Sequence, residues 1–282
     1  MNVLALVPPS KFAKNVARDL VYGCWCKGKR IAGIKFPPMS LVSVVTVLRA
    51  GGQEAKLLDA AAQGLDMGSL KSAVLPFDMI VMLTSTMTLN EDTEVLKELK
   101  KVNHKVKTVL FGGHVTAEPQ TTLAREGVDI VVRREAEYII RDLAKALEED
   151  NGQWQEVRGI SFLEKGKYCH NPDYPLIQNL DELPIPDRSL LPKDLDYFNP
   201  VVKRMPYTTM FTSRGCPGRC TFCSSPSFYG NSLRFRSTEA VLREMEEVAS
   251  LGYKEVFFRD EIFTVSKRRV MEICQGIKER KI

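Results

Sequence analysis

The amino-acid sequence predicts an α/β protein whose N-terminal half is a doubly wound parallel sheet. Short apolar, β-branched runs alternate with segments of helical period from residue 1 to about 150. A second, shorter β/α run begins near residue 206. The 282 residues, 44% of them apolar, are enough for one large or two modest domains. Strands that alternate with helices favour a parallel sheet covered on both faces.

Five strands and two long helices are predicted in the first part. The strands cover residues 2–7, 54–59, 79–85, 107–113 and 129–133. Residues 41–48 have their apolar side chains on one helical face, and this helix is expected to stop at Gly51. A second helix is predicted over 90–102, with Asn90 as its N-cap and acidic residues in its first turn.

The remainder of the chain divides into a connector and a second α/β unit. Residues 156–171 resemble a two-stranded ribbon that turns at Lys165–Gly166, and the stretch up to residue 205 is rich in proline. The second unit is expected to contain strands 207–213 and 255–260, a helix over 238–250 and a helix from Ser266 onward. The expected domains are 1–150, 151–205 and 206–282. Two βα units are too few to bury a parallel sheet, so further units are expected beyond Ile282.

Composition and charge narrow the classes of function. The formal net charge is +5, without a basic block interleaved with aromatic residues, so no nucleic-acid partner is expected. The first residues read as a buried strand rather than a signal peptide, and the apolar run at 41–48 is far shorter than the roughly 20 residues of a membrane span. We therefore expect a cytoplasmic protein without a membrane span.

Ligands of such a sheet are expected beyond the carboxyl ends of its strands. The loops there cover residues 8–11, 83–88, 112–119 and 133–137, and three of them carry small or hydroxylated residues that allow a flat ligand to approach the backbone. For Gly112–Gly113 alone, an ordinary strand-to-helix turn is the simpler interpretation.

The clearest chemical signal is the segment SRGCPGRCTFCSSPSF at residues 213–228. It places Cys216, Cys220 and Cys223 in one loop directly after a predicted strand. Zinc sites usually offer four ligands, and an iron–sulfur cluster normally takes four cysteines. Three thiolates therefore suggest a cluster with one open iron that can bind a reactant. Nearby glycine and proline residues allow the loop to wrap tightly.

This Cys-x3-Cys-x2-Cys loop resembles that of the radical S-adenosylmethionine (SAM) superfamily. The resemblance implies that Cys216, Cys220 and Cys223 hold a [4Fe-4S] cluster whose open iron binds SAM, which is cleaved to a 5′-deoxyadenosyl radical. It implies that Phe222 packs near the adenine. The family often has Gly-Gly-Glu after its second strand; this sequence has FFRDEIFT, so Asp260 and Glu261 are the SAM-binding candidates. A loop that caps the next helix is the alternative role for this pair.

The order of a Rossmann-like domain, a ribbon, the connector LDELPIPDRSLLP and the cysteine loop is similar to the cobalamin-binding subgroup of this family. The resemblance implies a cobalamin-binding domain at 1–150 and the first βα units of a partial TIM barrel at 206–282, apparently truncated within the barrel. The strand-end residues implied to line the cobalamin site are Pro8, Thr84, Ser85, Gly112, Gly113, His114 and Glu135. None of the three histidines follows an Asp-x-His pattern, so either cobalamin is bound without a protein histidine ligand, as this subgroup can do, or the cofactor site has decayed. His114 is expected to be a loop histidine that is hydrogen bonded to the backbone.

The other four cysteines are better explained by packing than by ligand roles. Cys24 and Cys26 are close in sequence but define no geometry. Cys274 falls on the apolar stripe of the last helix and is expected in the core. Radical SAM methylthiotransferases use three further N-terminal cysteines, and Cys24, Cys26 and Cys169 match that role poorly.

The function expected from this resemblance is methyl transfer to an unactivated carbon of a small-molecule substrate, with a reductant such as flavodoxin or ferredoxin as partner. Oxidative cyclisation or rearrangement is the alternative within the subgroup. Two further alternatives are a catalytically inactive cobalamin-binding fragment and a zinc-binding structural protein.

Overall fold

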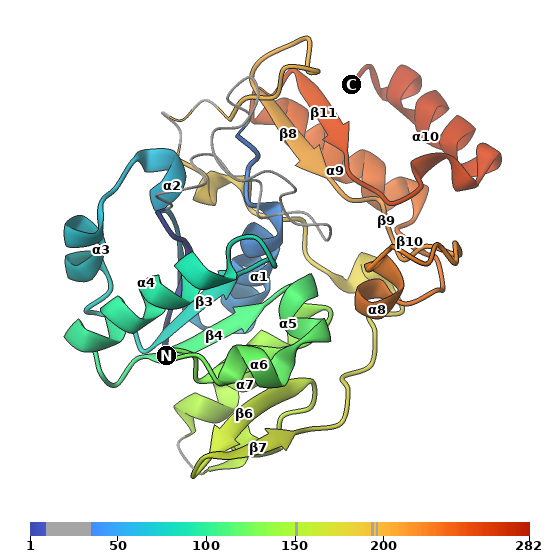
Figure 1. Ribbon diagram of the computed structural model, residues 1–282. Coiled ribbons are helices and arrows are strands. Elements are labelled where there is room, and N and C mark those ends of the chain that lie inside the picture. Colours follow the sequence, from blue (N-terminus) through green and yellow to red (C-terminus); the bar gives the residue numbers. More distant parts are fainter. Residues whose placement is uncertain (10–34, 150–151, 193–194, 196) are drawn as a thin grey trace.

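The computed structural model describes residues 1–9, 35–149, 152–192, 195 and 197–282. Its main feature is a seven-stranded sheet of order β2-β1-β3-β4-β5-β6-β7 (Figure 1). The strands are β1 (Asn2–Val7), β2 (Glu54–Asp59), β3 (Met79–Leu83), β4 (Lys107–Phe111), β5 (Ile130–Val132), β6 (Ile160–Glu164) and β7 (Lys167–His170). The first five pair in parallel, and β6 and β7 are antiparallel. All five predicted strands are confirmed, with the last three shorter than predicted.

Helices cover both faces of this sheet, which confirms the doubly wound arrangement. On one face lie α1 (Met39–Ala50) and α7 (Ala136–Glu148). On the other lie α2 (Ala60–Gln63), α3 (Met67–Ala73), α4 (Leu89–Val102), α5 (Gly113–Ala117) and α6 (Pro119–Leu123). Strand β1 shows why both faces are apolar: Val3 and Ala5 pack into the first layer and Leu4 and Leu6 into the second, because successive side chains of a strand point to opposite faces.

The predicted N-cap of α4, Asn90, was wrong by two residues. The helix begins at Leu89, with Thr88 as its N-cap residue, and Asn90 lies in the first turn. The side chain of Asn90 accepts a hydrogen bond from Arg125 (2.6 Å) instead of capping the helix. The turn that leads into the helix is made by Ser85 and Thr88, whose hydroxyl oxygens are 3.2 Å apart.

The predicted ribbon forms, and it extends the sheet. Strand β6 pairs with β5, and the turn at Lys165 and Gly166 has positive φ at both residues (49° and 80°), as a tight hairpin requires. A 3₁₀ turn, η2 (Gln153–Glu156), precedes the ribbon, and further 3₁₀ turns follow at η3 (Leu180–Glu182), η4 (Arg188–Leu190) and η5 (Phe263–Val265).

The second α/β unit is small. Strands β8 (Tyr207–Met210) and β11 (Glu255–Phe258) pair in parallel, and β9 (Ser213–Arg214) pairs with β10 (Arg234–Phe235) in antiparallel fashion. The helices are α8 (Ser225–Tyr229), α9 (Thr238–Ser250) and α10 (Lys267–Arg280). Helices α9 and α10 pack against one side of β8 and β11 through a separate apolar cluster.

One expected core residue of α10 is not in the core. Cys274 is exposed, whereas its neighbour Ile273 is buried. The buried side of the helix contains Ile273 and Gly276. Gly276 packs closely against α9, since a Cβ atom at this position would lie 2.2 Å from a methyl carbon of Leu242. Cys24 and Cys26 lie outside the described residues. In the described part of the chain, no helix has the length and apolar character needed to cross a bilayer.

Candidate functional site

The cysteine loop, residues 215–233, is closed at its base by two short strands. Arg214 of β9 faces Arg234 of β10 in the antiparallel register. Gly215 begins the loop at φ 89°, and a Cβ atom there would lie 2.2 Å from the carbonyl oxygen of Ser232. Only glycine fits this close approach, so the two ends of the loop are held together at Gly215.

The three cysteines are free thiols, and two of their sulfurs have nearby amide donors. Cys220 is exposed, and Cys216 and Cys223 are partly buried. A Cβ atom at Gly218 would lie 3.2 Å from Cys216 Sγ and 3.8 Å from Cys220 Sγ, so these two sulfurs face the same small gap. The backbone amides of Gly218 and Ser225 donate to Cys216 Sγ and Cys223 Sγ, each at 3.4 Å. Amide donors of this kind stabilise thiolates and tune a cluster.

This donor set fits an iron–sulfur cluster better than a single ion. In the described ranges, no three His, Cys, Asp or Glu side chains gather around one point as ligands of a single metal ion. The thiolates of a cluster bind separate irons, so they need not converge in that way. Soft sulfur ligands also select for iron–sulfur or zinc chemistry over hard cations.

Asp260 and Glu261 follow β11 and lie in different environments. Asp260 accepts hydrogen bonds from the Thr212 backbone amide (2.7 Å), the Ser213 hydroxyl (2.7 Å) and the Thr212 hydroxyl. These contacts use both carboxylate oxygens. Asp260 therefore holds the link from β8 to β9 beside the end of β11.

Glu261, in contrast, keeps a buried carboxylate oxygen, Oε2, with no hydrogen-bond partner among the described residues. Burial raises the pKa of Glu261 to about 7; the neighbouring Asp260 also raises it, while Arg214 and Arg259 lower it. An unpaired buried acceptor of this kind is suited to a cationic donor such as an ammonium group. Phe222, unlike Glu261, is exposed: 88% of its surface is accessible, and it lies between Cys220 and Cys223 in the sequence.

Three of the strand-end residues predicted to line a cobalamin site are buried at the ends of β1 and β3. Pro8 is buried directly after β1. The Thr84 hydroxyl donates to Asp92 (2.7 Å), and the Ser85 backbone amide donates to the Thr88 hydroxyl oxygen (3.2 Å), so both residues stabilise the turn into α4.

Gly112 is required by close packing at the end of β4. It has φ 129°, and a Cβ atom there would lie 2.4 Å from the carbonyl oxygen of Thr84. Gly113 and His114 begin α5. His114 Nδ1 lies 3.0 Å from the Thr86 hydroxyl oxygen, and burial lowers the pKa of this histidine. The expectation of a loop histidine bonded to the backbone was therefore wrong, because His114 lies in the first turn of α5 and its ring bonds to a side chain.

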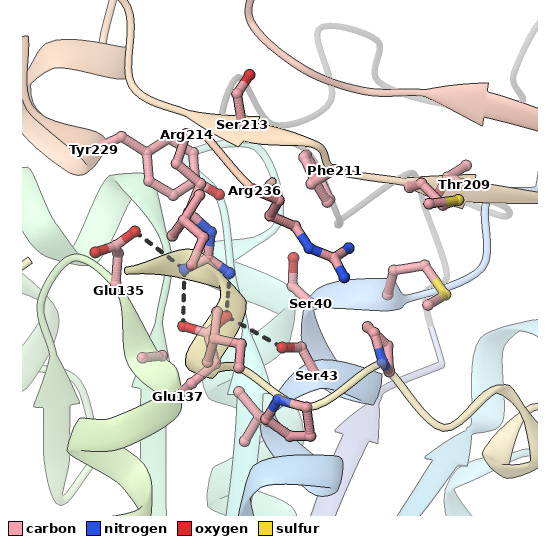
Figure 2. A pocket seen from close by; sticks show the side chains of 18 of the residues that line it. Ser40, Ser43, Glu135, Glu137, Thr209, Phe211, Ser213, Arg214, Tyr229 and Arg236 are labelled. Carbon is pink, nitrogen blue, oxygen red and sulfur yellow. Dashed lines mark hydrogen bonds and ion pairs between the residues drawn. The ribbon is translucent and has the colours of Figure 1, made fainter. Parts of the chain in front are cut away.

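Glu135 faces the second half of the chain. Its carboxylate accepts hydrogen bonds from Arg214 (3.0 Å), Arg234 (2.7 Å) and the backbone amide of Ile177 (2.8 Å). Glu137 also pairs with Arg214 and accepts a hydrogen bond from Ser43 (3.2 Å). Figure 2 shows Arg214 between these two carboxylates.

This ionic cluster lines a cavity between the two halves of the chain. Burial would lower the pKa of Arg214, but Glu137 and Glu135 raise it well above its usual range, so the guanidinium stays charged. The cavity has a volume of about 70 Å³ and is also lined by Ser40, Thr209, Phe211 and Arg236 (Figure 2). A water needs about 10–15 Å³ of such space, so the cavity has room for a few waters.

The loops of the two halves meet directly. Helix α5, which follows β4, contacts α8, which follows Cys223 (Figure 1). The cysteine loop therefore lies beside the strand-end edge where a doubly wound sheet binds its ligands.

Sequence reasoning missed Glu137, Arg214 and Arg234. Their signal is weak, because an acidic pair after β5 and single arginines beside the cysteines are ordinary surface residues in most sequences. Only the fold brings them together, since Glu135 is 79 residues from Arg214 and 99 from Arg234.

Comparison with known proteins finds a matching family for each half of the chain. A family model described as the B12 binding domain matches residues 31–144, and one described as the radical SAM superfamily matches residues 210–280. An uncharacterized methyltransferase of Pyrococcus horikoshii is 34% identical over 99% of this chain and 57% of its own length. The anaerobic magnesium-protoporphyrin IX monomethyl ester cyclase of Rubrivivax gelatinosus is 28% identical over 90% of this chain and 46% of its own length.

Among solved structures, the radical SAM methyltransferase TsrM of Kitasatospora setae, with cobalamin and a [4Fe-4S] cluster bound, aligns with a TM-score of 0.70. The alignment covers 100% of this chain and 52% of TsrM at 18% identity, which shows a shared fold. The chain spans about half the length of the curated relatives it matches.

Proposed function

Because the chain joins a B12-binding domain to a radical SAM domain and so belongs to the cobalamin-binding radical SAM family, we propose that the whole protein transfers a methyl group to an unactivated carbon of a small molecule. The observation that carries the proposal is the contact between α5 and α8, which puts the cysteine loop beside the strand-end edge of the B12-binding domain. Bound there, the cluster, SAM and cobalamin supply radical and methyl-transfer chemistry.

The chain's own residues would bind and orient these groups. Cys216, Cys220 and Cys223 would hold the cluster, and nearby backbone amides would donate to two of the sulfurs. Glu261 would accept the ammonium group of SAM, since its buried oxygen has no partner in the described chain. Phe222, exposed between two of the cysteines, would cover the adenine.

Cobalamin would lie on the edge formed by the ends of β1, β3 and β4. Pro8, Thr84, Ser85 and Gly112 are buried at this edge and would support the cofactor, and Gly113 and His114 begin α5 beside it. His114 is already hydrogen bonded to Thr86. A cobalt without a protein histidine ligand is therefore part of the proposal. Glu135 would act at this edge without touching the cofactor, because its carboxylate is engaged by Arg214 and Arg234.

The proposed reaction requires a one-electron donor such as flavodoxin or ferredoxin, and three reduced thiols suit a cytoplasmic setting. It includes no nucleic-acid partner. The domains proposed are 1–150 for cobalamin, 151–205 as the connector and 206–282 for the start of the barrel.

Oxidative cyclisation is the second candidate, favoured by the 28% identity to the magnesium-protoporphyrin cyclase over 90% of this chain. The two reactions differ in mass balance. Methyl transfer adds one carbon to the product and consumes a methyl donor, whereas cyclisation removes hydrogen without adding carbon.

The test is anaerobic reconstitution with iron, sulfide and hydroxocobalamin, followed by reduction in the presence of SAM. We expect broad iron–sulfur absorption that is lost in Cys216→Ala and kept in Cys274→Ala, which changes an exposed cysteine on α10. We also expect cobalamin to remain bound after desalting. A folded protein that takes up no iron would contradict the proposal.

A further inference from the structure

We propose that Glu135 is a positioning residue that holds both ends of the cysteine loop against the strand-end edge of the B12-binding domain. The inference rests on the proposed function, because it gives Glu135 the task of placing the cluster loop relative to the cobalamin edge.

The contacts of Glu135 reach three segments of the second half. One carboxylate oxygen accepts from Arg214 in β9 (3.0 Å), and the other accepts from Arg234 in β10 (2.7 Å) and from the Ile177 amide in the connector (2.8 Å). Arg214 and Arg234 face each other across the base of the loop. A single carboxylate therefore holds the two strands between which all three cysteines lie.

These contacts are buried and charge-assisted. The side chains of Glu135, Arg234 and Arg214 are 2%, 5% and 12% exposed. Arg234 also donates to the carbonyl oxygens of Ile177 (2.6 Å) and Tyr229 (2.9 Å), which connects the end of α8 to the same cluster. Such hydrogen bonds are short and directional, and removing one partner leaves a buried charge uncompensated. The loop base is therefore set in one position relative to α7.

Glu137 has a narrower set of contacts. It pairs with Arg214 and Ser43, so it reaches the β9 side of the loop base. The two glutamates can therefore be compared: Glu135 binds arginines in both β9 and β10, whereas Glu137 binds, of these two arginines, only the one in β9.

A matched control lies at the other end of the same strand. Asp129 precedes β5 as Glu135 follows it, and its carboxylate accepts from the Thr108 amide (2.9 Å) and pairs with Lys100. Asp129→Asn makes the same carboxylate-to-amide change as Glu135→Gln, at the opposite edge of the sheet.

The first experiment measures backbone hydrogen exchange in the unloaded 282-residue chain. In Glu135→Gln we expect peptides that contain β9 and β10 to exchange roughly tenfold faster or more, because a hydrogen bond to a charged group is lost on each side. Glu137→Gln should accelerate the β9 peptide more than the β10 peptide. Asp129→Asn should leave both within about twofold of the wild type.

Should Glu135→Gln fail to fold, Arg234→Lys provides the second variant. It keeps the charge, but one ammonium group cannot reach Glu135, Ile177 and Tyr229 together, so we expect faster exchange on the β10 side and at α8. Wild-type exchange rates at the loop base in folded Glu135→Gln or Arg234→Lys would overturn the inference. Equal acceleration by Asp129→Asn would overturn it as well.

The second experiment uses the reconstituted chain and pulsed electron paramagnetic resonance between the reduced cluster and cobalt(II) of added cobalamin. A broader distance distribution in Glu135→Gln, with the wild-type width kept in Asp129→Asn, is the expected result; equal widths would overturn the inference. If the wild-type chain assembles no cluster, the proposed function fails, while the exchange rates of the unloaded chain still decide the role of Glu135.

Discussion

Glu261 is a single side chain whose environment makes a pH-dependent prediction. Burial raises its pKa from an ordinary 4.5 to about 7, with Asp260 acting in the same direction against Arg214 and Arg259. Between these two pH values the folded chain holds a proton that the unfolded chain has lost, so this residue makes folding less favourable as pH rises. Below pH 4.5 both states are protonated and the effect disappears.

Glu261→Gln should therefore flatten the pH dependence. We expect the variant to gain stability relative to the wild type at pH 8 and to match it at pH 4, measured as the free energy of unfolding in urea. Asp260→Asn is the comparison, because Asp260 accepts three hydrogen bonds and its loss should destabilise the chain at pH 8. A gain in Glu261→Gln that is the same at both pH values would contradict the burial explanation.

An ammonium ligand at Glu261 would also lower its pKa, because a nearby positive charge favours the carboxylate. Binding of SAM near pH 6 should then release up to one proton per chain. Calorimetric titration in buffers of different ionisation enthalpy measures this release, and Glu261→Gln should abolish it. Binding without proton release in the wild type would mean that the ammonium group lies elsewhere.

At the scale of single elements, the cysteine loop depends on the shape of its base. Gly215 and Gly252 have nearly the same φ, 89° and 88°. A Cβ atom at Gly215 would lie 2.2 Å from the Ser232 carbonyl oxygen, whereas at Gly252 nothing lies within 4 Å. The pair separates the cost of an unusual φ from the cost of a steric clash.

Gly252→Ala should lose about 1–2 kcal/mol of stability, the cost of a positive φ for a residue with a side chain. Gly215→Ala should lose more, because β9 and β10 must separate, and it should also lower the iron bound per chain after reconstitution. Unfolding in urea and iron analysis measure the two effects. Equal stability losses with full iron content in both variants would show that the loop base tolerates a side chain.

The elements that the sequence predicted well are those with strong periodicity. The first two strands and α9 match their predicted bounds, because apolar alternation, β-branched residues and a serine N-cap at Ser237 act locally. Short helices such as α5 and α8 were not predicted, since five residues carry too little pattern. The ribbon was predicted, but its pairing with β5 was not, because strand partners are chosen by tertiary packing.

At the scale of the whole molecule, the cysteine motif is visible in the sequence, and its role as a cluster site stays a prediction, whereas the junction between the two halves could not be predicted. The three cysteines lie close together in the sequence, so the motif can be recognised without knowledge of the fold. The ion pairs of Glu135 join residues 79 and 99 positions apart, and only the folded chain shows that these side chains are buried together. The same holds for the connector, whose proline-rich sequence gave no sign of a buried charge.

That charge is Arg188, which ties the connector to the second α/β unit. Its side chain is fully buried, and it donates to Glu244 of α9 (2.6 Å), the Thr208 hydroxyl (3.1 Å) and the Thr209 carbonyl oxygen (3.1 Å). Glu244 also pairs with Arg236. Removing Arg188 leaves two buried acceptors in β8 without this donor. It also leaves the buried carboxylate of Glu244 in α9 with one fewer positive partner.

Arg188→Met should therefore cost about 3–5 kcal/mol, the usual result of breaking a buried ion pair, and the loss should appear in urea unfolding. Arg268→Met is the control, because that side chain is 90% exposed and its pair with Glu272 is screened by solvent, so its removal should leave the stability nearly unchanged. Hydrogen exchange locates the effect: β8 and α9 should open first in Arg188→Met, while the β1 to β5 sheet keeps its protection. Uniform loss of protection across both halves would instead mean that the connector stabilises the molecule as one cooperative unit.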